Sequence, residues 1–102
     1  MYVGTIVDTV STRPFELDEA KNAANVAKHG ISFEQAAAIF DGPVVSHTDR
    51  RKDYGETRTV TYGALGEQVV VAVVHTDRQA ITRIISARLA SARERGNYYV
   101  AL

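Results

Sequence analysis

The feature that most constrains the fold is a pair of closely punctuated helix signals between residues 18 and 43. Asp18 is placed as an N-cap, and four alanines recur at the i, i+3, i+4, i+7 spacing of one helix face. These are Ala20, Ala23, Ala24 and Ala27. Lys28 and His29 precede Gly30, which predicts the helix end. A first helix is therefore expected from Asp18 to His29, with its alanines turned inward.

The second helix signal follows at once. Ser32 is placed as an N-cap, Gln35 completes a capping box, and Ile31 is expected to pack against Ala36 as a hydrophobic staple. Gly42 and the proline after it predict the end of this helix. Both helices are alanine-rich, so their backbones are expected to approach closely and to pack as one unit.

Three strands are predicted after the helices. The polar residues 46–56 are expected to form an exposed loop. Residues 57–63 alternate like a strand with two unlike faces, residues 69–76 are nearly continuous valine, and residues 80–87 form the third run. The nearly continuous valine predicts a central strand covered on both faces, and the short turns between the strands predict an antiparallel meander.

These elements predict an α+β domain that spans residues 1–102, with two N-terminal helices on a small meander sheet and a short C-terminal helix. Residues 1–14 are interpreted as an N-terminal extension, either an added strand or a flexible arm. The chain has no cysteine, and its longest apolar run, Val69 to Val74, is far too short to span a membrane. We therefore expect a cytoplasmic protein without a membrane partner.

The net charge of zero conceals an asymmetry along the chain. Residues 78–102 contain five arginines and a single acid, Glu94, so the rest of the chain carries the opposite excess. Arginine grips phosphate through a planar fork and stays charged at any relevant pH. This tail is interpreted either as a site for phosphate or acidic partners, or as a solvated face.

No familiar catalytic or cofactor motif is present. The three histidines, at positions 29, 47 and 75, lack the spacing of a metal site. Serine-nucleophile, phosphate-loop and dinucleotide-binding motifs are also missing from the sequence. We expect neither a cofactor nor a metal, and His75 is interpreted as a structural histidine.

The arginines of the third strand are the clearest candidates for chemistry. Strict alternation would put Arg83 and Arg88 on opposite sheet faces, so only one could share a site with the last helix. Arg88 is nearer to that helix and is the preferred candidate. The helix begins at Ser91, which forms a capping box with Glu94, and Tyr98 or Tyr99 is expected to anchor it.

Two segments resemble a known family. They are FELDEAKNAANVAKHGISFEQAAAIFDGPV and RIISARLASARERGNYY, and their sharpest parts are K-x3-N-x2-KHG from Lys21 to Gly30 and ISAR followed by ER-x2-Y from Glu94 to Tyr98. From Phe15 to about Tyr99 the chain resembles the BrnT toxins of BrnT/BrnA type II toxin-antitoxin pairs. It departs from them at Leu17, where the family usually carries tryptophan, and in the length of residues 1–14.

The resemblance implies a RelE-like fold and a ribonuclease that inhibits translation by cutting RNA. It also implies a BrnA-like ribbon-helix-helix antitoxin as partner, with operator DNA bound only through the toxin-antitoxin complex. A non-catalytic module whose arginine surface docks an acidic antitoxin or nucleic acid is the alternative. A relative that still folds but neither cuts nor poisons is also compatible with the sequence.

Metal-independent RNA cleavage needs a base for the 2′-hydroxyl, cations around the phosphate and an acid for the leaving oxygen. The predicted catalytic residues are Arg88, Glu94, Tyr98 and His29. The predicted RNA phosphate ligands are Arg83, Arg95, Lys21 and Lys28. Glu94 already has a structural interpretation as a capping residue, and the cations at the end of the first helix have one as dipole compensation.

Overall fold

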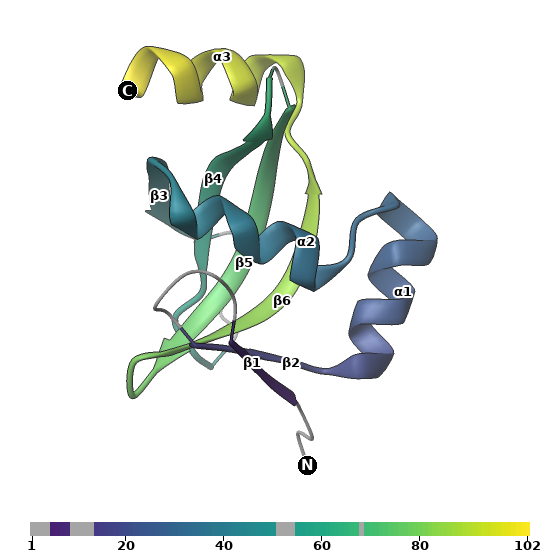
Figure 1. The fold of residues 1–102 in the computed structure, drawn as a ribbon. Helices are drawn as coiled ribbons and strands as arrows, with labels where there is room; N and C mark the ends of the chain where they lie inside the picture. The colour runs from purple at the N-terminus through teal and green to yellow at the C-terminus, as the bar shows by residue number, and fades with distance from the viewer. Residues whose placement is uncertain (1–4, 9–13, 51–54, 68) are drawn as a thin grey trace.

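The computed structural model describes residues 5–8, 14–50, 55–67 and 69–102, and it arranges six strands in one sheet in the order β1-β2-β6-β5-β4-β3 (Figure 1). The strands are β1 (Thr5–Asp8), β2 (Pro14–Leu17), β3 (Val44–Thr48), β4 (Thr59–Gly66), β5 (Val69–Arg78) and β6 (Ile81–Leu89). The helices are α1 (Glu19–His29), α2 (Phe33–Ala37) with the 3₁₀ turn η1 (Ala38–Asp41) after it, and α3 (Ala92–Ala101). In the described residues no helix is long and apolar enough to cross a membrane.

The sheet is mixed, so the expectation of a purely antiparallel meander is wrong. Strands β3 to β6 do form an antiparallel meander, but β2 pairs with β6 in parallel, with Phe15 opposite Thr82. A parallel pair needs a long connection, and the helices and the meander between β2 and β6 provide it. The expected loop at residues 46–56 is also wrong in part, because Ser46 to Thr48 belong to the edge strand β3.

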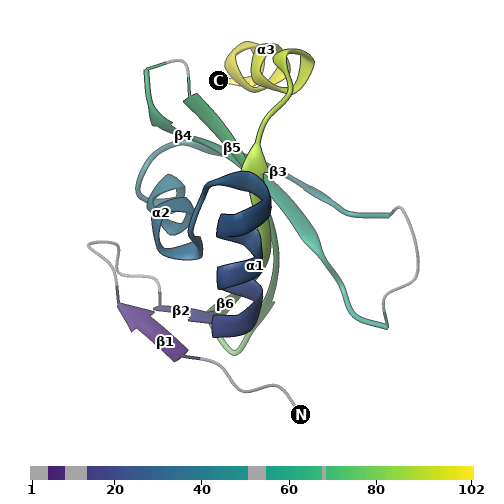
Figure 2. The same ribbon diagram turned by 90° about the vertical axis from the view of Figure 1, so that its right-hand side faces the viewer.

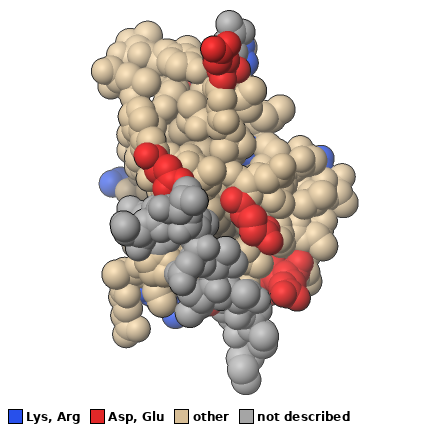
Figure 3. Space-filling model, viewed as in Figure 1, with Lys and Arg blue, Asp and Glu red and all other residues tan. Residues whose placement is uncertain are grey.

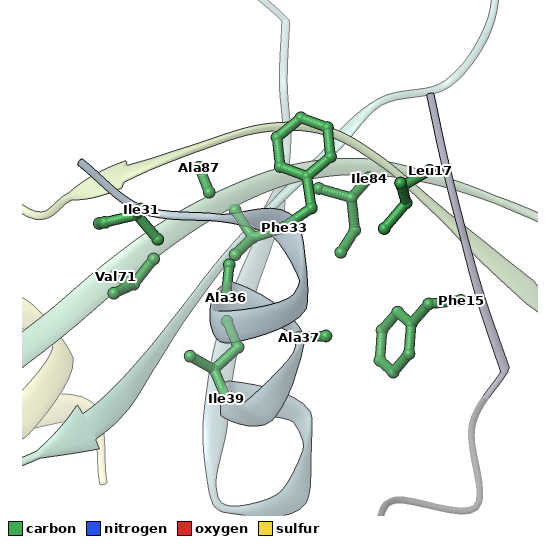
Figure 4. Packing of buried hydrophobic residues seen from close by; sticks show 11 residues of the cluster. Phe15, Leu17, Ile31, Phe33, Ala36, Ala37, Ile39, Val71, Ile84 and Ala87 are labelled. Carbon is green, nitrogen blue, oxygen red and sulfur yellow. The ribbon is translucent and has the colours of Figure 1, made fainter. Parts of the chain in front are cut away.

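One face of the sheet is covered by α2 and η1 (Figures 1 and 2). Figure 4 shows apolar side chains of these elements meeting those of β2, β5 and β6. Phe33, Ala36 and Ile39 are almost completely buried there. The cluster comprises Phe15, Leu17, Ile31, Phe33, Ala36, Ala37, Ile39, Val71, Val73, Ile84 and Ala87. The alanines of α2 thus face inward, as predicted.

The alanines of α1 do not face the core, so the prediction that they turn inward is wrong. All four are exposed, and the buried residue of this helix is Asn25. Alanine favours helices wherever it lies, so its spacing did not identify the packed face. The side of α1 that contacts the rest of the fold instead contains the polar residues Asn22 and Asn25. The Oδ1 of Asn22 accepts from the Phe33 N–H at 2.8 Å, and its Nδ2 donates to Glu34 at 2.7 Å. Polar hydrogen bonds therefore join α1 to α2.

Asn25 fastens α1 to the rest of the fold. Its Nδ2 donates to the carbonyl oxygens of Ile31 at 2.9 Å and Ala87 at 2.8 Å, and its Oδ1 accepts from the Ala87 N–H at 3.1 Å. Gly30, with a φ of 73°, ends the helix one residue before Ile31. The end of α1 is therefore held beside the β6 residue that precedes Arg88.

We expect Asn25→Ala to lower the free energy of unfolding by about 2 to 3 kcal/mol, because three buried backbone groups lose their partner. Urea unfolding followed by circular dichroism measures the difference. Ala24→Ser, an exposed change in the same helix, is the matched control and should alter stability by less than about 0.5 kcal/mol. Equal stability of Asn25→Ala and the control would contradict the role given to this amide.

A bulge in β6 decides which side chains share the opposite face. Ser86 pairs with Val74, and Ile84 pairs with His75, so Ile85 is an extra residue in β6. The alternation of β6 therefore reverses at this point. Arg83 and Arg88 pair with β5 residues four positions apart and lie on the same face, contrary to the prediction from strict alternation.

A chain of hydrogen bonds ties the meander strands on the helix-covered side. Ser46 Oγ lies 2.7 Å from Thr61 Oγ1, which lies 2.7 Å from His75 Nε2, while His75 Nδ1 lies 3.0 Å from Asp77 Oδ1. His75 is buried, and its ring packs edge-on against Phe40. These contacts give His75 a role in holding β3, β4 and β5 together.

Candidate active site

The sheet face opposite α2 contains an open hollow of about 670 Å³. Its floor is formed by side chains of β4, β5 and β6, and the end of α1, β3 and the start of α3 form its walls. The lining residues are Lys28, His29, His47, Asp49, Arg50, Val60, Tyr62, Val74, Ser86, Arg88 and Glu94. On the α2 side, drawn in Figure 3, acidic side chains are prominent and only small parts of Lys and Arg are visible.

Arg88 and Glu94 form a two-pronged ion pair at the α3 end of the hollow. Arg88 Nη1 donates to Glu94 Oε1 at 2.7 Å, and Nη2 donates to Oε2 at 2.9 Å. Nη1 also donates to the Leu89 carbonyl at 3.3 Å. A guanidinium has five N–H groups, so Nε–H and one Nη2–H are not used by these bonds. The Arg88 side chain is 42% exposed and lines the hollow.

Glu94 has every acceptor site occupied. Besides Arg88, it accepts from the Ser91 backbone N–H at 2.9 Å and from the Tyr62 hydroxyl at 2.8 Å. The Ser91 Oγ in turn accepts from the Glu94 backbone N–H at 3.1 Å, so the predicted capping box is present. The hydrogen bonds from Arg88 hold the pKa of Glu94 well below its usual value, and they raise the pKa of Arg88. Burial, followed by the contact with Glu94, raises the pKa of Tyr62.

We expect Glu94→Gln to lower the free energy of unfolding by about 1 kcal/mol at pH 7, a discounted value because Arg88 is partly exposed. Glutamine keeps the capping geometry and removes the charge. Because the folded-state pKa of Glu94 is depressed, its contribution is complete above the unfolded value of about 4.3 and is lost as pH falls below it. Urea unfolding should therefore show a smaller difference in the free energy of unfolding between the parent and Glu94→Gln at pH 3 than at pH 7. An equal difference at both pH values would contradict the role of the ion pair.

Two histidines enter the hollow from different elements. His29 ends α1, four residues after Asn25, which anchors that helix to β6. His47 lies on β3, opposite Val60 of β4, and its ring is tilted by 34° against that of Tyr62 with the centroids 5.7 Å apart. The His47 Nε2 lies 3.5 Å from the Tyr62 hydroxyl. Imidazoles are the side chains best suited to proton transfer near neutral pH.

A smaller cavity of about 170 Å³ adjoins the hollow and shares His47, Tyr62 and Glu94 with it. Val45, Asn97 and Tyr98 complete its lining. Tyr98 is buried and donates from its hydroxyl to the Pro43 carbonyl at 2.7 Å, which anchors α3 to the start of β3. The prediction that Tyr98 or Tyr99 anchors the helix is fulfilled by Tyr98, since Tyr99 is 45% exposed.

The predicted site residues are distributed unevenly. Arg88, Glu94, His29 and Lys28 line the hollow, and Tyr98 lines the smaller cavity. Arg83 lies on the same sheet face but outside the lining, as does Arg95 on α3, while Lys21 is exposed two helical turns before Lys28. The hollow thus brings together half of the eight predicted residues.

Sequence reasoning missed His47, Arg50 and Tyr62. His47 and Arg50 lie in residues 46–56, which were interpreted as a loop. The start of that stretch belongs to the short strand β3. The alternation of β4 puts Tyr62 on the same face as Val60, and that face is the floor of the hollow. In the described part of the chain, no group of three or more His, Cys, Asp or Glu is arranged to hold a metal ion.

Residues 17–94 match the family model described as the ribonuclease toxin BrnT of type II toxin-antitoxin systems. The chain is also similar to the crystal structure of the Brucella abortus ribonuclease toxin BrnT, with a TM-score of 0.56 and 26% sequence identity. That similarity covers 74% of this chain and 92% of the Brucella chain. No curated protein matches the sequence.

Proposed function

The chain belongs to the BrnT family of ribonuclease toxins of type II toxin-antitoxin systems, and on this premise we propose that it cleaves RNA in the hollow without a metal ion. The observation that carries the proposal is the meeting of Lys28, Arg50 and Arg88 with two histidines on one open sheet face. Cations for a phosphate and groups for proton transfer are thereby available in the same place.

The proposed reaction uses the RNA's own 2′-hydroxyl as nucleophile. A base removes the 2′-proton, the 2′-oxygen attacks the adjacent phosphorus, and the bond from phosphorus to the 5′-oxygen breaks. An acid then gives that oxygen a proton. The products are a 2′,3′-cyclic phosphate and a 5′-hydroxyl end, and no water, oxidant or metal is consumed in this step.

Arg88 is assigned to the phosphate, since it lines the hollow, its bonds to Glu94 and Leu89 do not use the Nε–H or one Nη2–H, and negative charge builds on the phosphate oxygens during attack. Lys28 and Arg50 supply further positive charge from the hollow's walls. Arg83, Arg95 and Lys21 are assigned to the RNA beyond the cleaved bond, because they lie outside the lining.

Glu94 is assigned to orienting Arg88 and not to proton transfer. Its carboxylate accepts four hydrogen bonds, and its lowered pKa keeps it ionised, so it has no proton to give. A carboxylate with such a low pKa is also a weak base. His29 and His47 are assigned to the two proton transfers, because both line the hollow and imidazole is the side chain best suited to this chemistry near neutral pH.

Incubation of a long RNA with the purified protein in EDTA tests the proposal. We expect fragments with 2′,3′-cyclic phosphate and 5′-hydroxyl ends, which resist a 5′-phosphate-dependent exonuclease and become labelled by polynucleotide kinase. Intact RNA in EDTA with cleavage restored by Mg²⁺ would refute the metal-independent mechanism. Growth arrest in cells whose RNA remains intact would instead support a binding module without catalysis.

A type II toxin has a cognate protein antitoxin, and for this chain we propose a BrnA-like ribbon-helix-helix protein. The family membership supports this assignment. Inhibition of translation and operator binding through the complex follow from the same proposal. Coexpression with the product of a neighbouring ribbon-helix-helix gene should restore growth and yield a complex that survives gel filtration; an unrelated neighbour that neutralises the toxin would refute it.

A further inference from the structure

The smaller cavity has the composition of a site for a flat aromatic group. The aromatic residues His47, Tyr62 and Tyr98 line it, together with Val45, Glu94 and Asn97. Its volume is about a quarter of that of the neighbouring hollow. Single-stranded RNA is recognised mainly by stacking of unpaired bases on aromatic side chains and by hydrogen bonds to the base edges.

The position of this cavity relative to the phosphate site is fixed by shared residues. His47, Tyr62 and Glu94 belong to both linings, so the two spaces adjoin at the ion pair of Arg88. In an RNA strand, a base adjoins each phosphate through one sugar. A strand with its phosphate at Arg88 would therefore bring a neighbouring base to the smaller cavity.

Asn97 can read the edge of such a base. On α3 it follows Glu94 by three positions and precedes Tyr98, which places it on the helix face that looks onto the cavity. No hydrogen bond joins its amide to another of the described residues. Every acceptor site of Glu94 and the hydroxyl proton of Tyr98 are already in use.

We propose that the smaller cavity binds the base adjacent to the cleaved phosphate and that Asn97 determines the base preference. An amide can donate to N7 of adenine and accept from its N6 amino group, which is the usual bidentate pairing of asparagine with a base, so adenine is the expected base. This inference rests on the proposed function, because the phosphate at Arg88 sets the register of the strand.

Cleavage positions on a long RNA of balanced composition test the proposal. In the parent protein we expect adenine at one position beside the cut to be favoured at least about fivefold. Asn97→Ala should reduce this preference below about twofold while total cleavage changes by less than about threefold. Val100→Ser, at an exposed position of the same helix, is the matched control and should keep the parent's preference.

Binding gives a readout that does not depend on cleavage. All-adenine and all-uracil 2′-O-methyl tetranucleotides, which lack the nucleophilic hydroxyl, can be compared by fluorescence anisotropy. The parent and Val100→Ser should bind the adenine oligomer at least about fivefold more tightly, and Asn97→Ala should bind both nearly equally.

The outcomes separate this inference from the proposed function. Cleavage with the same base preference in the parent and Asn97→Ala would overturn the inference and leave the nuclease intact. Binding discrimination that depends on Asn97, in a protein that does not cleave, would support the subsite and refute the nuclease. Absence of base preference in both assays would overturn the inference, and an Asn97-dependent preference for another base would overturn the assignment to adenine.

Discussion

Replacing Arg88 with alanine is expected to slow RNA cleavage by about 100- to 1,000-fold, because the guanidinium supplies hydrogen bonds and charge to the phosphate in the transition state. The loss should fall mainly on kcat, since the charge that Arg88 stabilises grows during attack. Arg88→Lys should remain strongly impaired, because an ammonium cannot pair with Glu94 at two points and still offer directed donors to the phosphate.

Two controls separate chemistry from folding in that experiment. Arg93→Ala removes an exposed arginine from the first turn of α3, outside the hollow, and should leave the rate within about twofold of the parent. Urea unfolding shows whether Arg88→Ala is still folded at the assay temperature. A folded Arg88→Ala protein with full activity would remove Arg88 from the mechanism.

Loss of either histidine from the hollow should be comparably severe. We expect His29→Ala and His47→Ala each to slow cleavage by about 100- to 10,000-fold, the range for a missing general acid or base. His75→Ala is not a suitable control, because that buried ring holds three strands together. Ala24→Ser, an exposed change on α1, serves that purpose and should leave the rate within about twofold of the parent's.

A modified substrate assigns the two roles. An RNA whose leaving 5′-oxygen is replaced by sulfur needs no acid, because a thiolate leaves without a proton. The variant that lacks the acid should regain most of the parent's rate on this substrate, and the variant that lacks the base should not. Near-parent cleavage of the ordinary substrate by both histidine variants would show that neither ring transfers a proton.

The helix ends could be predicted because their signals are local. The N-cap of Asp18, the left-handed Gly30 and the capping boxes of Ser32 and Ser91 each depend on residues within a few positions of one another. Local hydrogen bonds of this kind form in the same way whatever the distant chain does. The meander of β4, β5 and β6 was predictable for the same reason, since short turns join its strands.

The pairing of β2 with β6 could not be predicted in this way. It joins Phe15 to Thr82 across most of the chain, and nothing local in either strand specifies a parallel partner. The bulge at Ile85 was equally hidden, because strict alternation fits the sequence of β6 as well as the observed pattern does. Its consequence was large: it placed Arg83 on the face of Arg88.

The packed face of α1 shows why composition alone misled the prediction of the core. Four alanines at helical spacing formed the obvious apolar face, yet the buried position is Asn25, which satisfies three backbone groups. The motif K-x3-N-x2-KHG contains this asparagine. The structure gives a physical reason for the spacing of this motif. The amide of Asn25 holds α1 against β6, so that Lys28 and His29 line the hollow together with Arg88.

The most direct test of the account is where an RNA phosphate binds. A 2′-O-methyl dinucleotide titrated into the isotope-labelled protein should shift the NMR signals of the hollow, including the side chains of Val60, Val74 and Arg88, and the same titration of Arg88→Ala should give much weaker shifts. Shifts confined to the side covered by α2, or unchanged shifts in Arg88→Ala, would contradict the claim that the phosphate lies on the open sheet face at Arg88.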